Sequence, residues 1–492
     1  MIMRAILLLA AISIAAAAPT SSWEPMEELR SILLQQDYKN RILSVLENMQ
    51  QVIKDNDNTV AKEEQVCVPR SITQYFFCNG TDDRMVRNKI DIPYKWICRL
   101  KTKNSAGTST SFGTGFMIKI SPDVGRTVIM TAAHVLRKGT GRYVDKVEVY
   151  CPGREMEVVN TTSGAKNIMW IPDISLNHDP KWFHDFGFLT ISGNSSTGFG
   201  WSAYYDESEM RHEDLYACGY PQYKRTCAAN DDDTLYCGVG KQNSTYLKPC
   251  GPGYQGTLRP SCENWLKIDI DMDSGQSGGP LYAAINGNTY TVFGIVSIGG
   301  CPGRTFQRLT AEKIHNVLDK LGYNLTYKIR ATKVGKNSTY LHIDTTNVQK
   351  TYGSIGGRVY LRKYEQHDFA KVKIYPVRQT SSNVNNEQLK VIRSGTKANI
   401  FLRMDAANVN KNNEYAPCTV NCRYGIDDGK KEVFHVENHG QQTAFRSRLF
   451  DKVYLRLNWW EVKYGSKIEK SATCHYGNQI DGMDTHTLVE VP

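Results

Sequence analysis

The chain has 492 residues, which is more than one ordinary domain usually holds and favours two or three domains. Apolar residues make up 40% of it and aromatic residues 10%, which excludes a wholly disordered chain. The net charge is +10, and it is unevenly placed: 26 basic and 16 acidic residues lie between Leu325 and the C-terminus, and they carry the whole excess. This shift predicts a boundary near residue 324 and an anionic partner for the last third of the chain.

The first 18 residues have the pattern of a signal peptide. Arg4 supplies a positive charge, residues 5–14 are an apolar run, and the small residues 15–18 suit cleavage. An apolar run of about ten residues is too short to span a bilayer, and no later stretch is longer and as apolar. We therefore expect a secreted, extracellular protein without a transmembrane anchor.

Cysteines and glycosylation motifs agree with an oxidising compartment. The chain has 13 cysteines, an odd number, so one thiol should be free or paired with another chain. The spacing CTVNC at Cys418 and Cys422 favours a disulfide-bonded loop over a metal site. Asn-X-Ser/Thr motifs predict glycosylation at six positions, which are Asn79, Asn160, Asn194, Asn243, Asn324 and Asn337.

Residues 19–66 precede the first strand-like segment. Apolar residues recur at helical spacing between Leu29 and Ile53, which predicts a helix. We interpret this segment as a helical pro-segment or stalk; an oligomerising coiled coil is the alternative, but the heptads are too few to establish it.

Short apolar runs separated by turn residues fill residues 67–323, and they indicate an all-β domain. Its last element, TAEKIHNVLDKLGY, is a predicted helix that Thr310 caps and Gly322 ends. The strand pattern then resumes, so we expect residues 324–492 to form a basic, β-sandwich-like accessory domain. Within it, Arg446 and Arg448 are two residues apart, so on a strand their side chains would lie on the same face.

Two motifs point to nucleophilic catalysis. The first is TAAHV, which contains His134, and the second is DSGQSGGP, which contains Ser277. A serine hydroxyl needs a base within hydrogen-bond reach, and histidine titrates near neutral pH. The glycines of the second motif permit a tight turn, in which the N–H groups of Gly275 and Ser277 would stabilise a developing oxyanion.

These motifs resemble the chymotrypsin-like serine peptidases over residues 67–323, about half of the chain. The resemblance implies two β-barrels, with a base at His134 and a nucleophile at Ser277. It also implies an acid between them that heads an apolar strand. Asp185 in HDFGFLTI fits this description, whereas three other carboxylates do not lead directly into such a strand, which are Asp173, Asp179 and Asp206.

Within that family, GTGFMI, ACGYP and LKIDIDMDSGQSGGP resemble the glutamyl-endopeptidase-like branch. Gln276 stands where trypsin-type members have an aspartate that pairs with a newly cut N-terminus, so activation by that ion pair is not expected. Met272 and Val296 replace a Thr and a His that hold a substrate glutamate in many members, so glutamate specificity is not expected either. We assign these two residues, with Asp271 and Ser297, to the substrate pocket, where Asp271 would favour Lys or Arg in the substrate.

The sequence thus predicts a secreted serine endopeptidase that cleaves protein or peptide substrates through a Ser-His-Asp triad and an acyl-enzyme. This chemistry requires no metal and no organic cofactor. A catalytically inactive homologue that acts as an extracellular binding protein is the alternative. The basic C-terminal domain predicts an anionic glycan or surface as a further partner, and no nucleic-acid-binding module is evident.

Overall fold

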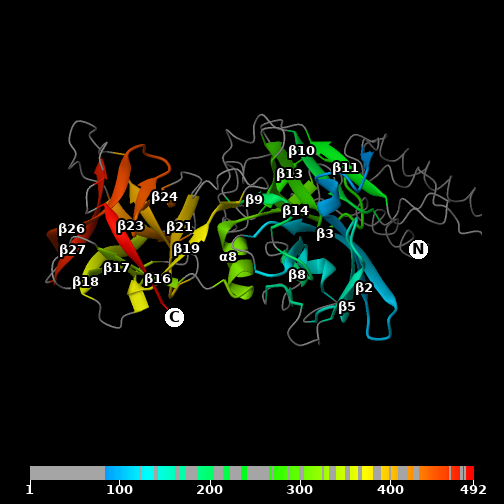
Figure 1. The fold of residues 1–492 in the computed structure, drawn as a ribbon, viewed down its shortest axis with the longest axis horizontal. Coiled ribbons are helices and arrows are strands. Elements are labelled where there is room, and N and C mark those ends of the chain that lie inside the picture. The colour runs from blue at the N-terminus through cyan, green and yellow to red at the C-terminus, as the bar shows by residue number, and fades with distance from the viewer. Residues whose placement is uncertain are drawn as a thin grey trace, which may run out of the picture. The chain divides into compact units, whose positions relative to one another are not determined.

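The computed structural model describes most of the chain from residue 84 onward (Figure 1). The predicted signal peptide, the segment 19–66 and the motifs at Asn79, Asn243, Asn324 and Asn337 lie outside the described residues. Described are residues 84–120, 124–137, 142–160, 167–172, 185–194, 196–203, 214–221, 234–240, 265–268, 270–285, 289–298, 304–323, 326–331, 339–348, 355–363, 368–379, 389–397, 400–407, 419–424, 431–464, 467–476, 480 and 484–491.

The chain is mostly β, as predicted, and its described strands form three sheets. The first sheet has seven strands in the order β6-β5-β2-β3-β4-β8-β7. Its core is apolar, and a disulfide joins Cys98 in β2 to Cys151 just after β5. The strands span Ile97–Lys103 (β2), Ser109–Ile118 (β3), Thr127–Thr131 (β4), Lys146–Tyr150 (β5), Glu157–Asn160 (β6), Met169–Trp170 (β7) and Gly187–Ile191 (β8).

The second sheet has nine strands, and together with the first it gives the expected double-barrel peptidase fold. Its main order is β1-β11-β10-β13-β14-β15-β12, and a disulfide joins Cys218 in β10 to Cys237 in β11. The strands span Met85–Arg87 (β1), Gly200–Ser202 (β9), Leu215–Gly219 (β10), Leu235–Gly240 (β11), Trp265–Ile268 (β12), Pro280–Ile285 (β13), Thr289–Ile298 (β14), Arg304–Arg308 (β15) and Arg378–Gln379 (β20).

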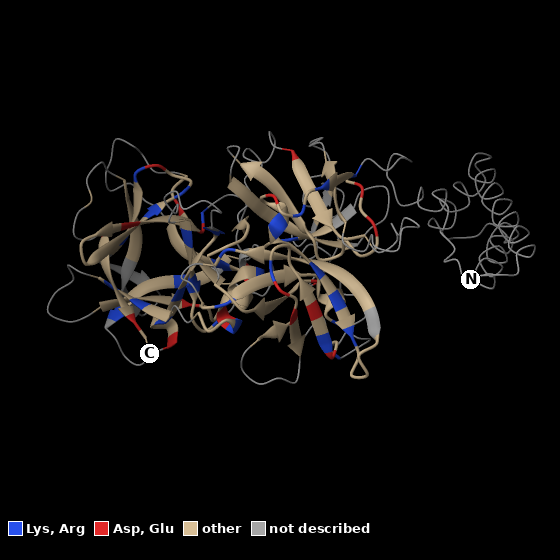
Figure 2. Ribbon diagram, turned by 45° about the vertical axis from the view of Figure 1, so that its right-hand side comes forward, with Lys and Arg blue, Asp and Glu red and all other residues tan. Residues whose placement is uncertain are grey.

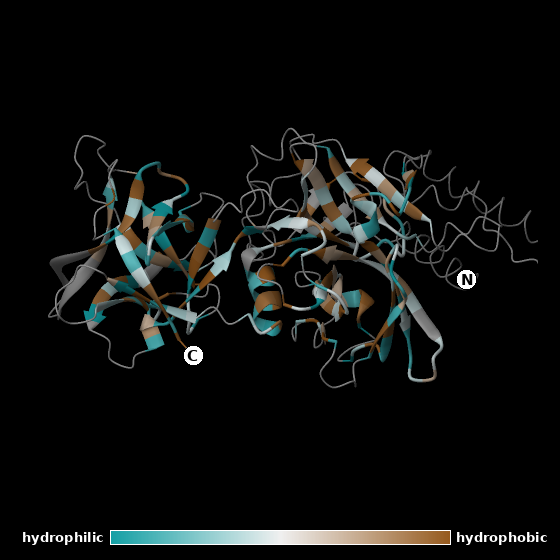
Figure 3. Cartoon of the chain, viewed as in Figure 1, coloured by the Kyte–Doolittle hydropathy of each residue, from teal (hydrophilic) through white to brown (hydrophobic). Residues whose placement is uncertain are grey.

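The predicted helix at the end of this region is confirmed as α8, Ala311–Lys320. The Thr310 hydroxyl accepts a hydrogen bond from Lys313 N at 3.4 Å, which satisfies an N–H group that the first turn leaves open. Gly322 follows the helix with φ +80°, a conformation that favours glycine. Figure 3 shows hydrophobic and hydrophilic bands along this helix, and its apolar face is buried.

The C-terminal strands form a single twelve-stranded sheet whose pairing closes on itself. Six strands pair in a ring, β16-β19-β21-β24-β25-β28, and β28 returns to β16. The other six form three hairpins, β17–β18, β22–β23 and β26–β27, so each third of the sheet repeats one four-strand pattern. The all-β prediction holds for this region, but the pairing is barrel-like and not that of a two-layer sandwich.

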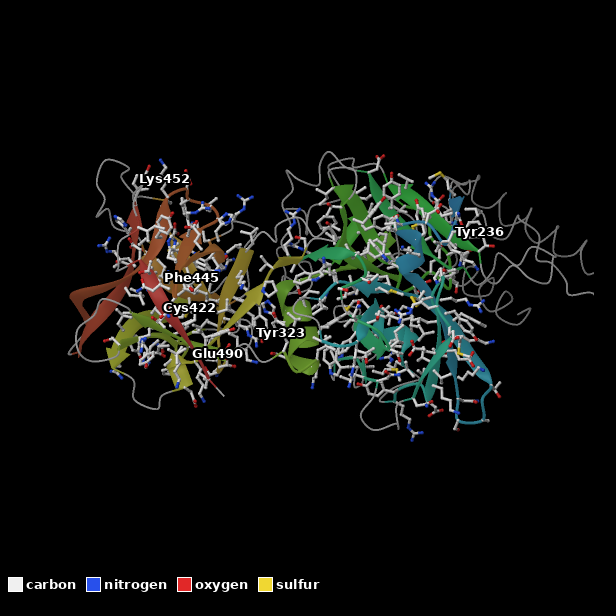
Figure 4. The ribbon with its side chains drawn as sticks, in the orientation of Figure 1. Tyr236, Tyr323, Cys422, Phe445, Lys452 and Glu490 are labelled. Carbon is white, nitrogen blue, oxygen red and sulfur yellow. A yellow bond between two sulfur atoms is a disulfide. The ribbon has the colours of Figure 1, made fainter. Side chains whose placement is uncertain are left out.

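These strands span Thr326–Ala331 (β16), Thr339–Asp344 (β17), Ile355–Lys363 (β18), Val372–Pro376 (β19), Leu389–Ser394 (β21), Ile400–Asp405 (β22), Thr419–Tyr424 (β23), Val433–His439 (β24), Gln442–Ser447 (β25), Val453–Tyr464 (β26), Lys467–Tyr476 (β27) and Thr485–Glu490 (β28). They enclose an apolar core of their own, in which Cys422 and Phe445 lie (Figure 4).

The expected disulfide of the CTVNC motif is wrong, because Cys422 is a free, buried thiol. It lies in β23, which pairs with both β18 and β22, and its sulfur packs against Gly357. Burial raises the pKa of this thiol to about 12, so it behaves as a small apolar side chain and not as a reactive thiolate.

Asp319 near the end of α8 connects the helix to three side chains of the C-terminal strands. Its carboxylate accepts hydrogen bonds from Lys373 at 2.8 Å, from Arg393 at 3.1 Å and from the Tyr375 hydroxyl. Burial alone would raise the pKa of Asp319, but the hydrogen bonds of Lys373 and Tyr375 outweigh it and hold that pKa below its usual range. The compact unit 76–492 includes all of these residues.

Candidate active site

His134 lies in a short 3-10 turn, Ala133–Val135, which follows β4 directly. All five residues of β4 are buried, and Ala132 and Ala133 after it are buried as well. The small alanines let the turn pack closely against the sheet, and the imidazole keeps 34% of its surface exposed. The motif TAAHV therefore ends a buried strand and presents one polar side chain at its edge.

Asp185 is placed beside this turn by the register of β4 and β8. Thr131 pairs with Gly187 in the antiparallel ladder, so the residues after β4 adjoin those before β8. The Asp185 carboxylate accepts a hydrogen bond from the His134 backbone N–H at 2.9 Å, and its other oxygen lies 2.8 Å from His134 Nδ1. The two oxygens thus hold both the backbone and the ring of the histidine.

Ser297 supplies a further contact that the sequence did not predict. Its hydroxyl donates to Asp185 Oδ2 at 2.5 Å, and the residue is 4% exposed. The sequence assigned Ser297 to the substrate pocket, and that role stays a prediction beside its contact with the carboxylate of Asp185.

The pKa values of this pair shift in opposite directions. Burial would lower the pKa of His134, but the negative charge and hydrogen bond of Asp185 outweigh it and raise that pKa above the usual 6.5. Burial would raise the pKa of Asp185, but His134 and then Ser297 hold it below the usual 3.8. Asp185 is therefore ionised at neutral pH, and its negative charge favours the protonated form of His134.

Ser277 lies on the turn that leads into β13, and this turn is bound to both sheets. Thr114 of β3 donates from its N–H to Ser277 O at 2.8 Å and from its hydroxyl to Gly275 O at 2.9 Å. Gly278 donates to Val296 O at 2.7 Å, next to the serine that contacts Asp185. The turn is thus tied to β14 on one side and to β3 on the other.

Gly278 shows how closely the turn approaches the histidine-bearing segment. It has φ +88°, and a Cβ built on it would lie 2.1 Å from Thr114 O and 3.0 Å from Ala132 N. Only glycine fits this space, because the obstacles are backbone atoms. Ala132 stands two residues before His134, so the serine turn and the histidine turn are packed against each other.

The serine turn also leaves two N–H groups pointing to no carbonyl. The N–H groups of Gln276, Gly278 and Gly279 donate to backbone oxygens. Among the residues that the structure describes, no hydrogen bond is donated by the N–H of Gly275 or of Ser277. Gly275 has φ +92°, which turns the backbone in a way that other residues rarely adopt. Two N–H groups of this kind, on residues separated only by Gln276, suit an oxyanion.

The remaining predicted pocket residues are all buried: Val296 lies in β14, and Asp271 and Met272 lie between β12 and β13. Met272 and Val296 belong to the apolar core of the second sheet, in which they pack with Phe306 and other residues. Asp271 is 3% exposed, and its backbone lies against Gly238. Their role in substrate binding stays a prediction.

Two arginines of the basic C-terminal domain are paired with carboxylates. Arg446 in β25 donates to Glu437 at 2.5 Å, and Arg456 in β26 is 5% exposed and lies 3.7 Å from Asp484. Lys452 lies in the turn between the two strands with φ 57°, so no single strand runs through. Figure 2 shows acidic and basic residues interspersed over this region. The carboxylates of Glu437 and Asp484 thus face these two arginines, and an anionic partner of this domain stays a prediction.

Of the six predicted glycosylation sites, Asn160 and Asn194 lie in the described part, and Asn194 is exposed at the end of β8. No described helix has the length and apolar character needed to cross a membrane.

Comparisons with known proteins identify the domain. Residues 113–295 match the trypsin-like peptidase domain family, and no curated protein matches the chain. A Glu endopeptidase in complex with MPD is 17% identical with a TM-score of 0.34, over 49% of this chain and 98% of that chain. Protease Anisep from Arthrobacter nicotinovorans is 14% identical with a TM-score of 0.32, over 48% of this chain and 98% of that one.

The designed three-fold symmetric protein ThreeFoil is 14% identical with a TM-score of 0.24, over 34% of this chain and 100% of that chain. These TM-scores are too low to assign a function, so the domain assignment rests on the family match over residues 113–295. The chain therefore contains a trypsin-like peptidase domain over residues 113–295.

Proposed function

We propose that the protein is a secreted endopeptidase in which Ser277, His134 and Asp185 form the catalytic triad. The observation that carries this proposal is the double contact of Asp185 with the backbone N–H and the Nδ1 of His134. A carboxylate in this position fixes the imidazole with Nδ1 as its donor and leaves Nε2 as the basic nitrogen. The packing of the serine turn against Ala132 supports Ser277 as the group that Nε2 serves.

In the proposed reaction, the Ser277 hydroxyl attacks the peptide carbonyl carbon and transfers its proton to His134. The carbonyl oxygen becomes an oxyanion, which accepts hydrogen bonds from the N–H groups of Gly275 and Ser277. His134 then passes the proton to the leaving amine, and an acyl-enzyme forms. Water then attacks the acyl-enzyme and gives a proton to His134, which returns it to Ser277 as the carboxylic acid product leaves. Asp185 keeps its charge throughout and stabilises the imidazolium.

The specificity of the substrate pocket and the extracellular location are also proposals. Asp271 supports a preference for Lys or Arg in the substrate, because a buried carboxylate favours a basic partner. The disulfides Cys98–Cys151 and Cys218–Cys237, the signal-peptide pattern and the exposed Asn194 support a secreted, glycosylated product. An anionic glycan or surface as a partner of the C-terminal domain rests on the charge excess alone. An inactive binding homologue, the alternative, is disfavoured because all three triad residues are present.

The pH dependence of turnover tests the role of His134. A protonated imidazole cannot accept the serine proton, so kcat/KM is expected to fall as the pH drops below the pKa of His134. Because Asp185 raises this pKa, the midpoint should lie above 6.5. Peptide hydrolysis by the purified protein, measured between about pH 5 and 9, gives the profile. A rate that stays constant over this range would exclude a histidine base.

A further inference from the structure

The first described residues of the chain invert the usual pattern of burial. The side chain of Arg84 is fully buried, whereas the apolar residues Met85 and Val86 after it are 40% and 61% exposed. Burying a guanidinium costs free energy unless charged or polar partners surround it. The hydrophobic effect alone would turn this segment the other way, so specific polar contacts must hold Arg84 inside.

Those contacts come from the serine turn. Arg84 Nη1 donates to Gln276 Oε1 at 2.6 Å, and its Nη2 lies 3.5 Å from Asp273 Oδ2. The guanidinium also stacks 5.7 Å from the ring centroid of Tyr236 in β11, which Figure 4 labels. The planar fork of arginine thus contacts two residues of the turn that bears Ser277.

These two residues shape the turn from within. Gln276 is fully buried; its Oε1 also accepts from Asp273 N at 2.7 Å, and its Nε2 donates to Tyr236 O at 3.2 Å. Asp273 Oδ1 accepts from Ser274 N at 2.7 Å, while its Oδ2 has no hydrogen-bond partner among the described residues. Arg84 therefore supplies the positive charge that faces a buried carboxylate oxygen at the start of the turn.

The position of Arg84 is itself fixed. It directly precedes β1, in which Met85 pairs with Cys237 and Val86 pairs with Tyr236 of β11. Cys237 is joined to Cys218 of β10, and β10 pairs with β13, the strand that follows the serine turn. The guanidinium is thus delivered from a strand that belongs to the same sheet as the turn.

We propose that Arg84 is a positioning residue that holds residues 273–277 in the shape in which the N–H groups of Gly275 and Ser277 receive the oxyanion. This inference rests on the proposed function. The buried side chain of Arg84 would order this turn, so full activity would require Arg84. Arg84 acts through Gln276 and Asp273 and touches no reacting atom.

Labelling kinetics with a fluorophosphonate probe test this inference on the full-length protein. The probe's phosphonyl oxygen occupies the oxyanion position once the serine has attacked. Arg84→Met removes the charge and the fork, so the maximal labelling rate should fall by about 10²-fold, comparable to the loss of one oxyanion donor. The half-saturating probe concentration and the pH midpoint of His134 should stay unchanged. Arg84→Lys restores the charge but not the fork, so its rate should lie between the two.

Arg87→Met is the matched control, because Arg87 ends the strand that Arg84 precedes but contacts Met85 and the ring of Tyr94. It should label at the wild-type rate. A maximal rate for folded Arg84→Met within threefold of wild type would overturn the inference, and so would an equal loss in Arg87→Met. If Arg84→Met does not fold, a wild-type rate for Arg84→Lys overturns it instead. Loss of labelling in Ser277→Ala separates these outcomes from failure of the proposed function itself.

Discussion

Replacing Ser277 with alanine is expected to lower kcat for peptide hydrolysis by a factor on the order of 10⁶, and His134→Ala should do the same. The nucleophile and its base act as one unit, because the hydroxyl is unreactive without a proton acceptor. The double variant should therefore lose little more activity than either single variant. Steady-state kinetics of the three purified variants provide the measurement.

The fold should survive these changes, because Ser277 and His134 are partly exposed and belong to no apolar core. Equal melting temperatures for the variants and the wild type serve as the control. Losses that multiply in the double variant would show that the two residues act independently, which contradicts a shared mechanism.

The second large effect is expected for Asp185→Asn, which should lower kcat by a factor on the order of 10⁴. The amide cannot fix the imidazole with Nδ1 as donor, and it cannot stabilise the imidazolium. Since the Asp185 charge and hydrogen bond raise the pKa of His134 against the effect of burial, their removal should lower that pKa. The remaining activity should therefore reach its midpoint at lower pH than in the wild type.

Ser297→Ala is the matched variant for this test. It removes one hydrogen bond to Asp185 Oδ2 but leaves the carboxylate in place. We expect a loss of about tenfold in kcat, because a hydrogen bond to a charged group contributes about 1.5–3 kcal/mol. An Asp185→Asn variant with an unshifted pH midpoint, or one no more impaired than Ser297→Ala, would argue against the orienting role.

The strands, the helix α8 and the pairing of His134 with Asp185 were accessible from sequence because each depends on a local pattern. TAAHV ends an apolar strand, HDFGFLTI begins one, and Thr310 and Gly322 carry the signals of a helix start and stop. These two strands are adjacent and antiparallel in one sheet, so the end of one lies beside the start of the other. The sequence pattern was therefore enough to predict that His134 and Asp185 meet.

The contacts of Arg84 and Ser297 were out of reach because they depend on pairing between distant segments. Arg84 stands 192 residues before Gln276, and Ser297 stands 112 residues after Asp185. An arginine before a short strand usually indicates a solvated face, and nothing local indicates that it turns inward. The three-fold repeat of the C-terminal sheet is likewise carried by strand pairing and not by a visible repeat of residues.

The most direct test of the triad is to identify the residue that a fluorophosphonate probe modifies in the purified protein. Mass spectrometry of the labelled peptide should place the adduct on Ser277, because the proposed triad gives this hydroxyl a base that activates it. Ser274, exposed three residues earlier on the same turn, is the control, so Ser274→Ala should label fully and Ser277→Ala should not label. An adduct on another serine, or an unlabelled wild-type protein, would contradict the proposed catalytic triad.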